Sequence, residues 1–95
     1  MMPFYTYIVA SKRNGTLYTG STDDLAKWVF EHQSGTGSRF TAEHSVGLLV
    51  WYEVHETREA AFTRERQIKE WKRLWKLELI ERFNPGWRDR VGELI

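Results

Sequence analysis

The sequence predicts an α+β fold, in which a three-stranded and at least partly antiparallel sheet is flanked by helices. Two segments rich in β-forming residues, 4–11 and 16–20, surround an Asn-Gly turn. The most apolar run, residues 46–54, predicts the central strand of the sheet. Helical patterns of apolar residues lie between and after these segments, and this order of strands and helices is typical of an α+β protein.

The composition indicates one small domain. The 95 residues suit a single domain, 1–95, in which we expect a core over about 3–84 and a tail over 85–95. Five Trp, five Phe and four Tyr supply the apolar bulk of the core. The absence of Cys excludes disulfides and thiolate zinc sites and predicts a cytoplasmic protein. No apolar run reaches the ~18 residues of a membrane span. The net charge of +1 favours no class of ligand, and a monomer is the default expectation.

The predicted hairpin brings two tyrosines together. Asn and Gly at 14–15 tolerate the positive φ of a type I′ turn, and a two-residue turn pairs Ser11 with Tyr18. Because side chains alternate along a strand, Tyr7 and Tyr18 then share one face of the hairpin. Gly20 leaves open backbone beside them, where a ligand can approach closely.

A helix is predicted directly after the hairpin. Thr22 and the two Asp residues that follow form a good helix start, and the helix ends near residue 33, before a Ser-Gly-Thr-Gly break. A further short helix is expected over 39–44. The inward stripe of the first helix consists of Leu25, Trp28, Val29 and His32.

The second half of the chain is predicted to be mainly helical. Thr57 caps a long helix that reaches at least Trp71, and a break or kink separates it from a last helix over about 75–82. An Asn-Pro-Gly sequence at 84–86 ends that helix. The inward stripe of these helices consists of Ala61, Glu65, Ile68, Trp71 and Trp75. The tail is expected to pack through Trp87, Val91 and Leu94.

Glu65 is the most informative candidate for chemistry. A carboxylate on the inward stripe needs a hydrogen bond, an ion pair or a metal ion. The alternative is a solvated glutamate beside Arg64 and Lys69. His32, in the last helical turn, is more simply explained as a structural or surface histidine, and the two tyrosines alone as ordinary strand aromatics.

Basic residues form a stripe on the second half of the long helix. Such a stripe is usually the solvated face of an amphipathic helix. Because it is interleaved with Trp71 and Trp75, it can instead contact a phosphate backbone. Its members are Lys69, Lys72, Arg73 and Lys76.

Several short motifs occur in a fixed order along the chain. Tyr-Thr-Tyr stands at 5–7 and Tyr-Thr-Gly at 18–20, followed by characteristic segments at 20–32, 64–71 and 75–87. Together they resemble the GIY-YIG nuclease superfamily, and within it the small stand-alone branch related to Slx1-type nucleases. The resemblance covers essentially the whole chain.

This resemblance implies metal-dependent hydrolysis of phosphodiester bonds in DNA, with a single Mg²⁺ or Mn²⁺ ion and with branched or damaged DNA as candidate substrates. It implies that Tyr7 helps to activate the attacking water, that Tyr18 contacts the phosphate or supports the base, and that His32 assists proton transfer or phosphate binding. Glu65 corresponds to the carboxylate that holds the cation, and Asn84 to an asparagine beside it.

Trp28 departs from the family pattern, which has an arginine at this position, one turn before the histidine. A guanidinium would clamp the scissile phosphate and lower the pKa of the tyrosine, and an indole does neither. Lys27 projects about 100° away around the helix. We therefore expect a weakened or inactive nuclease. The alternatives are a non-catalytic nucleic-acid-binding module with the same fold, and a protein-interaction domain that uses exposed Trp residues.

Overall fold

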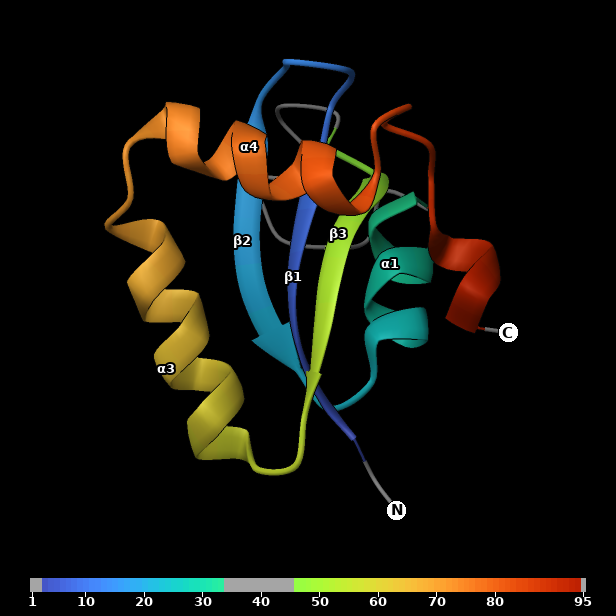
Figure 1. Ribbon diagram of the computed structural model, residues 1–95. Coiled ribbons are helices and arrows are strands. Elements are labelled where there is room, and N and C mark those ends of the chain that lie inside the picture. Colours follow the sequence, from blue (N-terminus) through green and yellow to red (C-terminus); the bar gives the residue numbers. More distant parts are fainter. Residues whose placement is uncertain (1–2, 34–45, 95) are drawn as a thin grey trace.

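A three-stranded antiparallel sheet lies between helices in the computed structural model, which describes residues 3–33 and 46–94 (Figure 1). The α+β prediction is confirmed, and the short helix expected over 39–44 lies outside the described residues. Within these residues, no helix is both long and apolar enough to cross a bilayer. The elements are β1 (Phe4–Ala10), β2 (Leu17–Thr22), α1 (Leu25–Gln33), β3 (Leu48–His55), α3 (Arg58–Lys69), α4 (Arg73–Phe83) and the 3-10 helix η1 (Val91–Leu94).

β1, and not the more apolar β3, is the central strand, so this prediction was wrong. The order in the sheet is β2-β1-β3. Residues 49–51 of β3 are all buried, and a register shift against Ile8 and Val9 indicates a bulge there. The C-terminal segment covers the outer side of β3, where the Arg90 backbone N donates to the Leu49 carbonyl at 2.8 Å. Helices and the C-terminal segment thus cover β3. This cover explains why an edge strand of the sheet is so apolar.

The hairpin turn is longer than predicted. The Ser11 backbone N donates to the Thr16 carbonyl at 3.0 Å, which leaves residues 12–15 as the loop. Val9, and not Ser11, pairs with Tyr18, so the predicted register was wrong by two residues. Because the side-chain period of a strand is two, this shift leaves every side chain on its predicted face.

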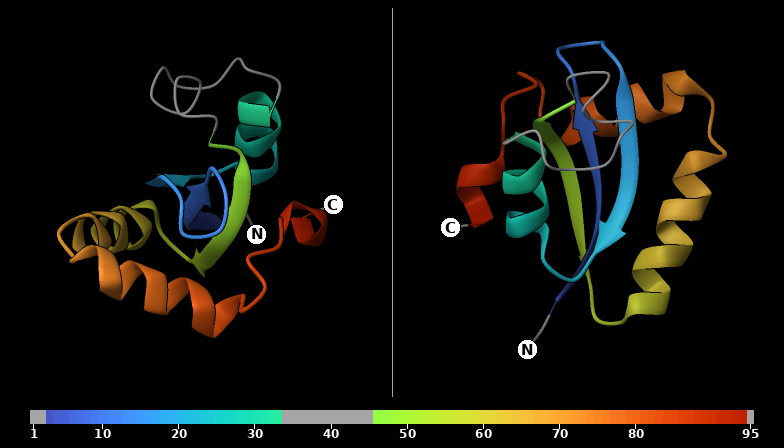
Figure 2. Two further views of the ribbon diagram at one scale, coloured as in Figure 1. Left: turned by 90° about the horizontal axis from the view of Figure 1, so that it is seen from above. Right: turned by 180° about the vertical axis from the view of Figure 1, so that it is seen from behind.

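The two faces of the sheet carry different helices and different cores (Figure 2). α3 and α4 cover one face, whose core consists of Ile8, Ala10, Val50, Trp51, Ile68, Ile80 and Trp87. α1 and η1 cover the other face, whose core consists of Tyr7, Val9, Leu25, Val29, Val46 and Leu49. Tyr18 and Trp28 pack against this second core, as do Val91 and Leu94 of the C-terminal segment. The shared face of the two tyrosines and the packing of the tail are confirmed.

The long predicted helix is divided in two. The Thr57 hydroxyl accepts from the Ala60 backbone N at 3.1 Å, as expected for its cap. α3 ends at Lys69 and α4 begins at Arg73, so the predicted break exists and Trp71 lies within it. We call residues 70–72 the α3–α4 junction.

Candidate active site

The Tyr7 side chain lies over Gly20 of the edge strand β2. The two residues are paired across the sheet, and Tyr7 is only 1% exposed. A Cβ atom on Gly20 would lie 2.4 Å from the Tyr7 Oη and 2.6 Å from its Cζ. Glycine at this position therefore makes room for the phenol, and the prediction that its backbone is open to a ligand was wrong.

Glu65 reaches β2 from the opposite face of the sheet. Ser21 Oγ donates to Glu65 Oε1 at 2.6 Å, and Lys69 Nζ donates to Oε2 at 2.6 Å. The predicted inward position of Glu65 is confirmed, since the residue is 9% exposed. Ser21 was missed in the sequence, because helical periodicity identifies a buried carboxylate but not its partner 44 residues away.

Tyr7 and Glu65 thus lie on opposite faces of the edge strand β2, at its consecutive residues Gly20 and Ser21. Burial raises the pKa of Tyr7 far above its ordinary value, and the neighbouring Tyr18 and Glu65 raise the pKa further. In this arrangement Tyr7 is a proton donor at neutral pH and a poor base.

Trp28 packs against both tyrosines and His32. Its ring centroid lies 4.3 Å from that of Tyr7, 5.7 Å from that of Tyr18 and 3.3 Å from that of His32. Burial lowers the pKa of His32, against a smaller opposite effect of Glu31, so the imidazole is neutral at pH 7. The fold therefore brings together the four residues that the sequence indicated on this face.

Asn84 lies elsewhere, against β3. Its Nδ2 donates to the carbonyls of Val50 at 3.2 Å and Arg88 at 2.7 Å, and its Oδ1 accepts from the Arg88 backbone N at 3.1 Å. Because β1 separates β3 from β2, Asn84 and the Ser21–Glu65 bond belong to opposite edges of the sheet. These bonds give Asn84 a structural role, which is to hold the turn after α4 against β3.

We expect Asn84→Ala to lower the free energy of unfolding by about 2 kcal/mol, because buried backbone groups lose their partners. Urea unfolding followed by Trp fluorescence measures this loss. Arg88→Ala keeps the backbone groups that bind Asn84 and is the matched control, with an expected change within about 0.5 kcal/mol. Equal midpoints for Asn84→Ala and the unmodified protein would contradict the structural role.

The basic residues predicted as one stripe do not share a helix. Lys69 ends α3, Lys72 lies in the junction, and Arg73 and Lys76 belong to α4. The break in the helix removes their common face, so the single-stripe prediction was wrong. Lys69 binds Glu65, and Arg73 Nη2 donates to the carbonyls of Asn14 and Gly15 at 2.7 and 2.6 Å.

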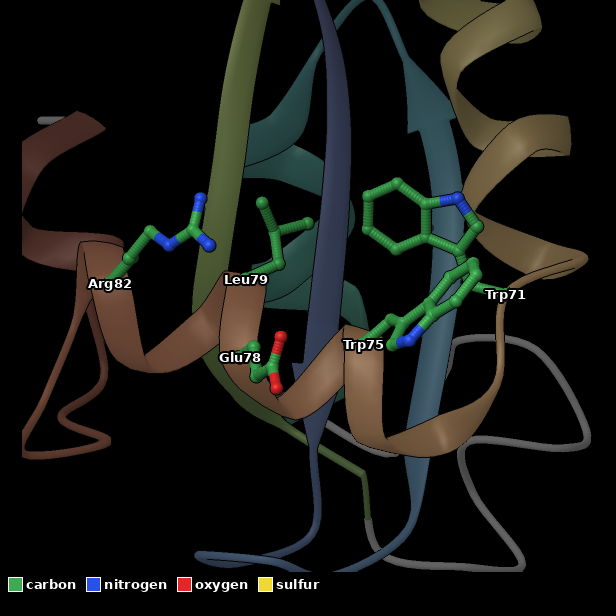
Figure 3. A pocket seen from close by; sticks show the side chains of 5 residues that line it. All are labelled: Trp71, Trp75, Glu78, Leu79 and Arg82. Carbon is green, nitrogen blue, oxygen red and sulfur yellow. The ribbon is translucent and has the colours of Figure 1, made fainter.

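A shallow hollow of about 240 Å³ lies on α4 and the α3–α4 junction, on the face of the sheet opposite to α1 (Figure 3). Trp71 and Trp75 meet edge to face there, with ring centroids 6.3 Å apart, and Trp75 is 50% exposed. Trp51 and Trp87 are buried, so they cannot form the exposed Trp surface that a protein-interaction domain would require. The hollow is lined by Trp71, Trp75, Glu78, Leu79 and Arg82.

Comparisons with known proteins identify the family of this chain. Residues 3–78 match the GIY-YIG catalytic domain family. The chain is 40% identical over 76 residues to a UPF0213 protein of Staphylococcus saprophyticus, which covers 80% of this chain and 92% of that protein. It is 40% identical over 77 residues to a UPF0213 protein of Haloquadratum walsbyi, with 81% and 85% covered.

A solved structure extends the comparison to the fold. The solution NMR structure of a UPF0213 protein from Bacillus halodurans is similar to this chain, with a TM-score of 0.57, 27% identity and 93% of both chains covered. The family match includes β2 with Gly20 and Ser21, the cluster around Trp28, and Glu65 on α3. The chain therefore belongs to the GIY-YIG family.

Proposed function

We propose that this protein hydrolyses phosphodiester bonds in DNA with the help of one divalent cation, and that Trp28 makes the reaction slow. The observation that carries the proposal is the placement of Tyr7 and Glu65 on the two faces of β2, at Gly20 and Ser21, within a GIY-YIG domain. Hydrolysis of a phosphodiester needs a cation site, a proton acceptor and donors for developing charge. Glu65, the neutral His32 and the two phenols offer these groups.

Glu65 is the residue that would hold the cation, since GIY-YIG nucleases generally use divalent metal ions. Among the described residues, no three acidic, imidazole or thiol side chains gather into a metal cluster. One carboxylate fits Mg²⁺ or Mn²⁺, because these ions accept oxygen ligands and keep several waters. A bound cation of this kind stabilises charge on the phosphate and activates water.

The remaining groups act on the phosphate from the other face of β2. Tyr7 stays protonated and donates a hydrogen bond, and His32 is the group that can take a proton at neutral pH. Nothing at position 28 supplies the positive charge that would lower the pKa of Tyr7. We attribute slow turnover to this missing charge.

Lys69 should compete with the cation for Glu65, because its ammonium already binds Oε2. We expect Lys69→Gln to increase the affinity for Mn²⁺ about two- to fivefold, a modest gain because the lysine is half exposed and its ion pair is screened. Titration calorimetry measures this affinity, and Lys72→Gln, which removes the same charge nearby, is the control. An equal gain in both variants would indicate a general charge effect and exclude competition by Lys69.

The proposed activity is tested on fluorescently labelled four-way junction, flap, duplex and single-stranded DNA with Mg²⁺ or Mn²⁺. The unmodified protein, Glu65→Ala and Trp28→Arg are compared. We expect slow cleavage that Glu65→Ala abolishes and, from the likeness to Slx1-type nucleases, a preference for the branched substrates. If neither the unmodified protein nor Trp28→Arg gives products that depend on Glu65, the nuclease proposal is wrong.

The second candidate is a DNA-binding module that does not cleave. Two observations favour it: an indole stands at position 28, and the Lys69 ammonium already binds the carboxylate of Glu65, which would hold the cation. This candidate predicts DNA binding that is unchanged in Glu65→Ala and independent of divalent cations, with no cleavage by Trp28→Arg.

A further inference from the structure

The turn between β1 and β2 is fixed to the start of α4 by Arg73. The guanidinium donates to two consecutive carbonyls of the turn, those of Asn14 and Gly15, although 58 and 59 residues separate them in the sequence. Figures 1 and 2 show the turn and the start of α4 at the same end of the molecule. The turn and the α3–α4 junction therefore form one continuous surface.

This surface carries basic side chains from both segments. We call Lys12 and Arg13 of the turn, with Lys72 and Arg73 of the junction and α4, the basic ridge. All four residues are exposed. In the part of the chain that the structure describes, Lys12, Arg13 and Lys72 make no ion pair, and Glu70 is the only acidic residue in the junction. The ridge thus presents positive charge that is not paired with a carboxylate of the described residues.

The ridge and the candidate active site lie at the two ends of β2. Six residues separate Gly15, at the ridge, from Ser21, which binds Glu65. At a rise of ~3.3 Å per residue, this corresponds to about 20 Å. Duplex DNA rises ~3.4 Å per base pair along the helix axis, so the separation equals about six base pairs when the axis runs along β2.

We propose that the basic ridge binds the phosphate backbone of DNA, on the strand that faces it, about six base pairs from the bond positioned at the Glu65 site. The inference rests on the proposed function and adds a second contact to it. An extended polyanion such as DNA fits this arrangement, because β2 runs from the ridge to the Glu65 site. A DNA backbone that lies along β2 can therefore contact both. Arg73 orients the ridge through its bonds to the turn, while Lys12, Arg13 and Lys72 contact phosphates.

Charge reversal tests the contact. Each phosphate contact contributes ~0.9 to the slope of log affinity against log salt, so Lys12→Glu with Arg13→Glu should reduce this slope by about two and weaken binding to a 30-base-pair duplex about tenfold or more. Lys72→Glu, on the other segment, should reduce the slope by about one. The control is Arg82→Glu with Arg88→Glu, which makes the same change of charge away from the ridge and should alter affinity less than twofold.

Site-directed footprinting tests the spacing. Since the chain has no Cys, a cysteine at Arg13→Cys or at Asp23→Cys, just beyond the other end of β2, is a unique attachment point for an iron chelate that cleaves nearby DNA. On a duplex with one single-strand flap, the two probes should cut at positions about six to eight base pairs apart.

The proposed contact would be contradicted if both probes cut at the same position. It would also be contradicted if the ridge variants left the slope of log affinity against log salt unchanged. Neither experiment requires catalysis by the protein. A protein that binds through the ridge but never cleaves DNA would disprove the nuclease proposal and leave the ridge in place. Cleavage that depends on Glu65 but is unaffected by substitution of Lys12, Arg13 and Lys72 would support the nuclease proposal and contradict the ridge.

Discussion

Trp28→Arg should increase the rate of DNA cleavage that depends on Glu65 by about a hundredfold. The indole ring is centred 4.3 Å from that of Tyr7, so a guanidinium at this position can reach both the phenol and a phosphate bound beside it. Its charge would oppose the burial that raises the pKa of Tyr7 and would stabilise the charge that develops on the phosphate. Initial rates at saturating Mg²⁺ with a labelled flap substrate measure the gain.

Three variants separate the effect of charge from the effect of space. Trp28→Leu removes the ring without adding charge and should give no gain. Trp28→Lys adds charge but lacks the planar guanidinium that can donate two parallel hydrogen bonds to a phosphate. It should therefore give a smaller gain in rate than Trp28→Arg. Trp28→Arg with Glu65→Ala should be inactive. Equal gains in the leucine and arginine variants would show that the indole acts only by filling space.

Gly20→Ala should be the most destabilising of these substitutions, with a loss of about 3 kcal/mol in the free energy of unfolding. The new methyl group would lie 2.4 Å from the Tyr7 Oη and 2.6 Å from its Cζ, and this ring is buried and cannot move aside. Thermal unfolding should show a midpoint lowered by about 10 °C or more, given the size of the domain.

Gly92→Ala is the matched control, because a Cβ there meets no atom within 4 Å. Its stability should stay within about 0.5 kcal/mol of the unmodified protein. In a Tyr7→Ala background, Gly20→Ala should cost much less, since the clashing ring is gone. A full additive loss in that double variant would show that the strain does not come from Tyr7.

The fold could be predicted in outline because local signals govern most of its elements. Alternation along the strands, the Thr57 cap and the Asn-Pro-Gly stop at 84–86 are all local, and each identified its element. The central position of β1 could not be predicted in this way. The apolar character of β3 reflects cover from the C-terminal segment, where Arg90 meets Leu49, and this contact joins residues far apart in the chain.

The site could be predicted in halves but not as a whole. Helical periodicity identified Glu65 as buried, and strand alternation put Tyr7 and Tyr18 on one face. The role of Gly20 depends on which residue faces it, and the register of the hairpin depends on the length of its loop. The charge on Lys69 could be read from the sequence, but its bond to Glu65 depends on side-chain geometry that the sequence does not specify.

The two halves of the site belong to different cores, and this has a consequence for substitutions at position 28. Tyr7 and Trp28 are held by the core beneath α1, whereas Glu65 is carried by α3, which packs through Ile68 into the other core. The side chains that pack around Trp28 are therefore different from those that pack around Glu65. For the nuclease that we propose, the residue at position 28 can therefore change without repacking the side chains around Glu65.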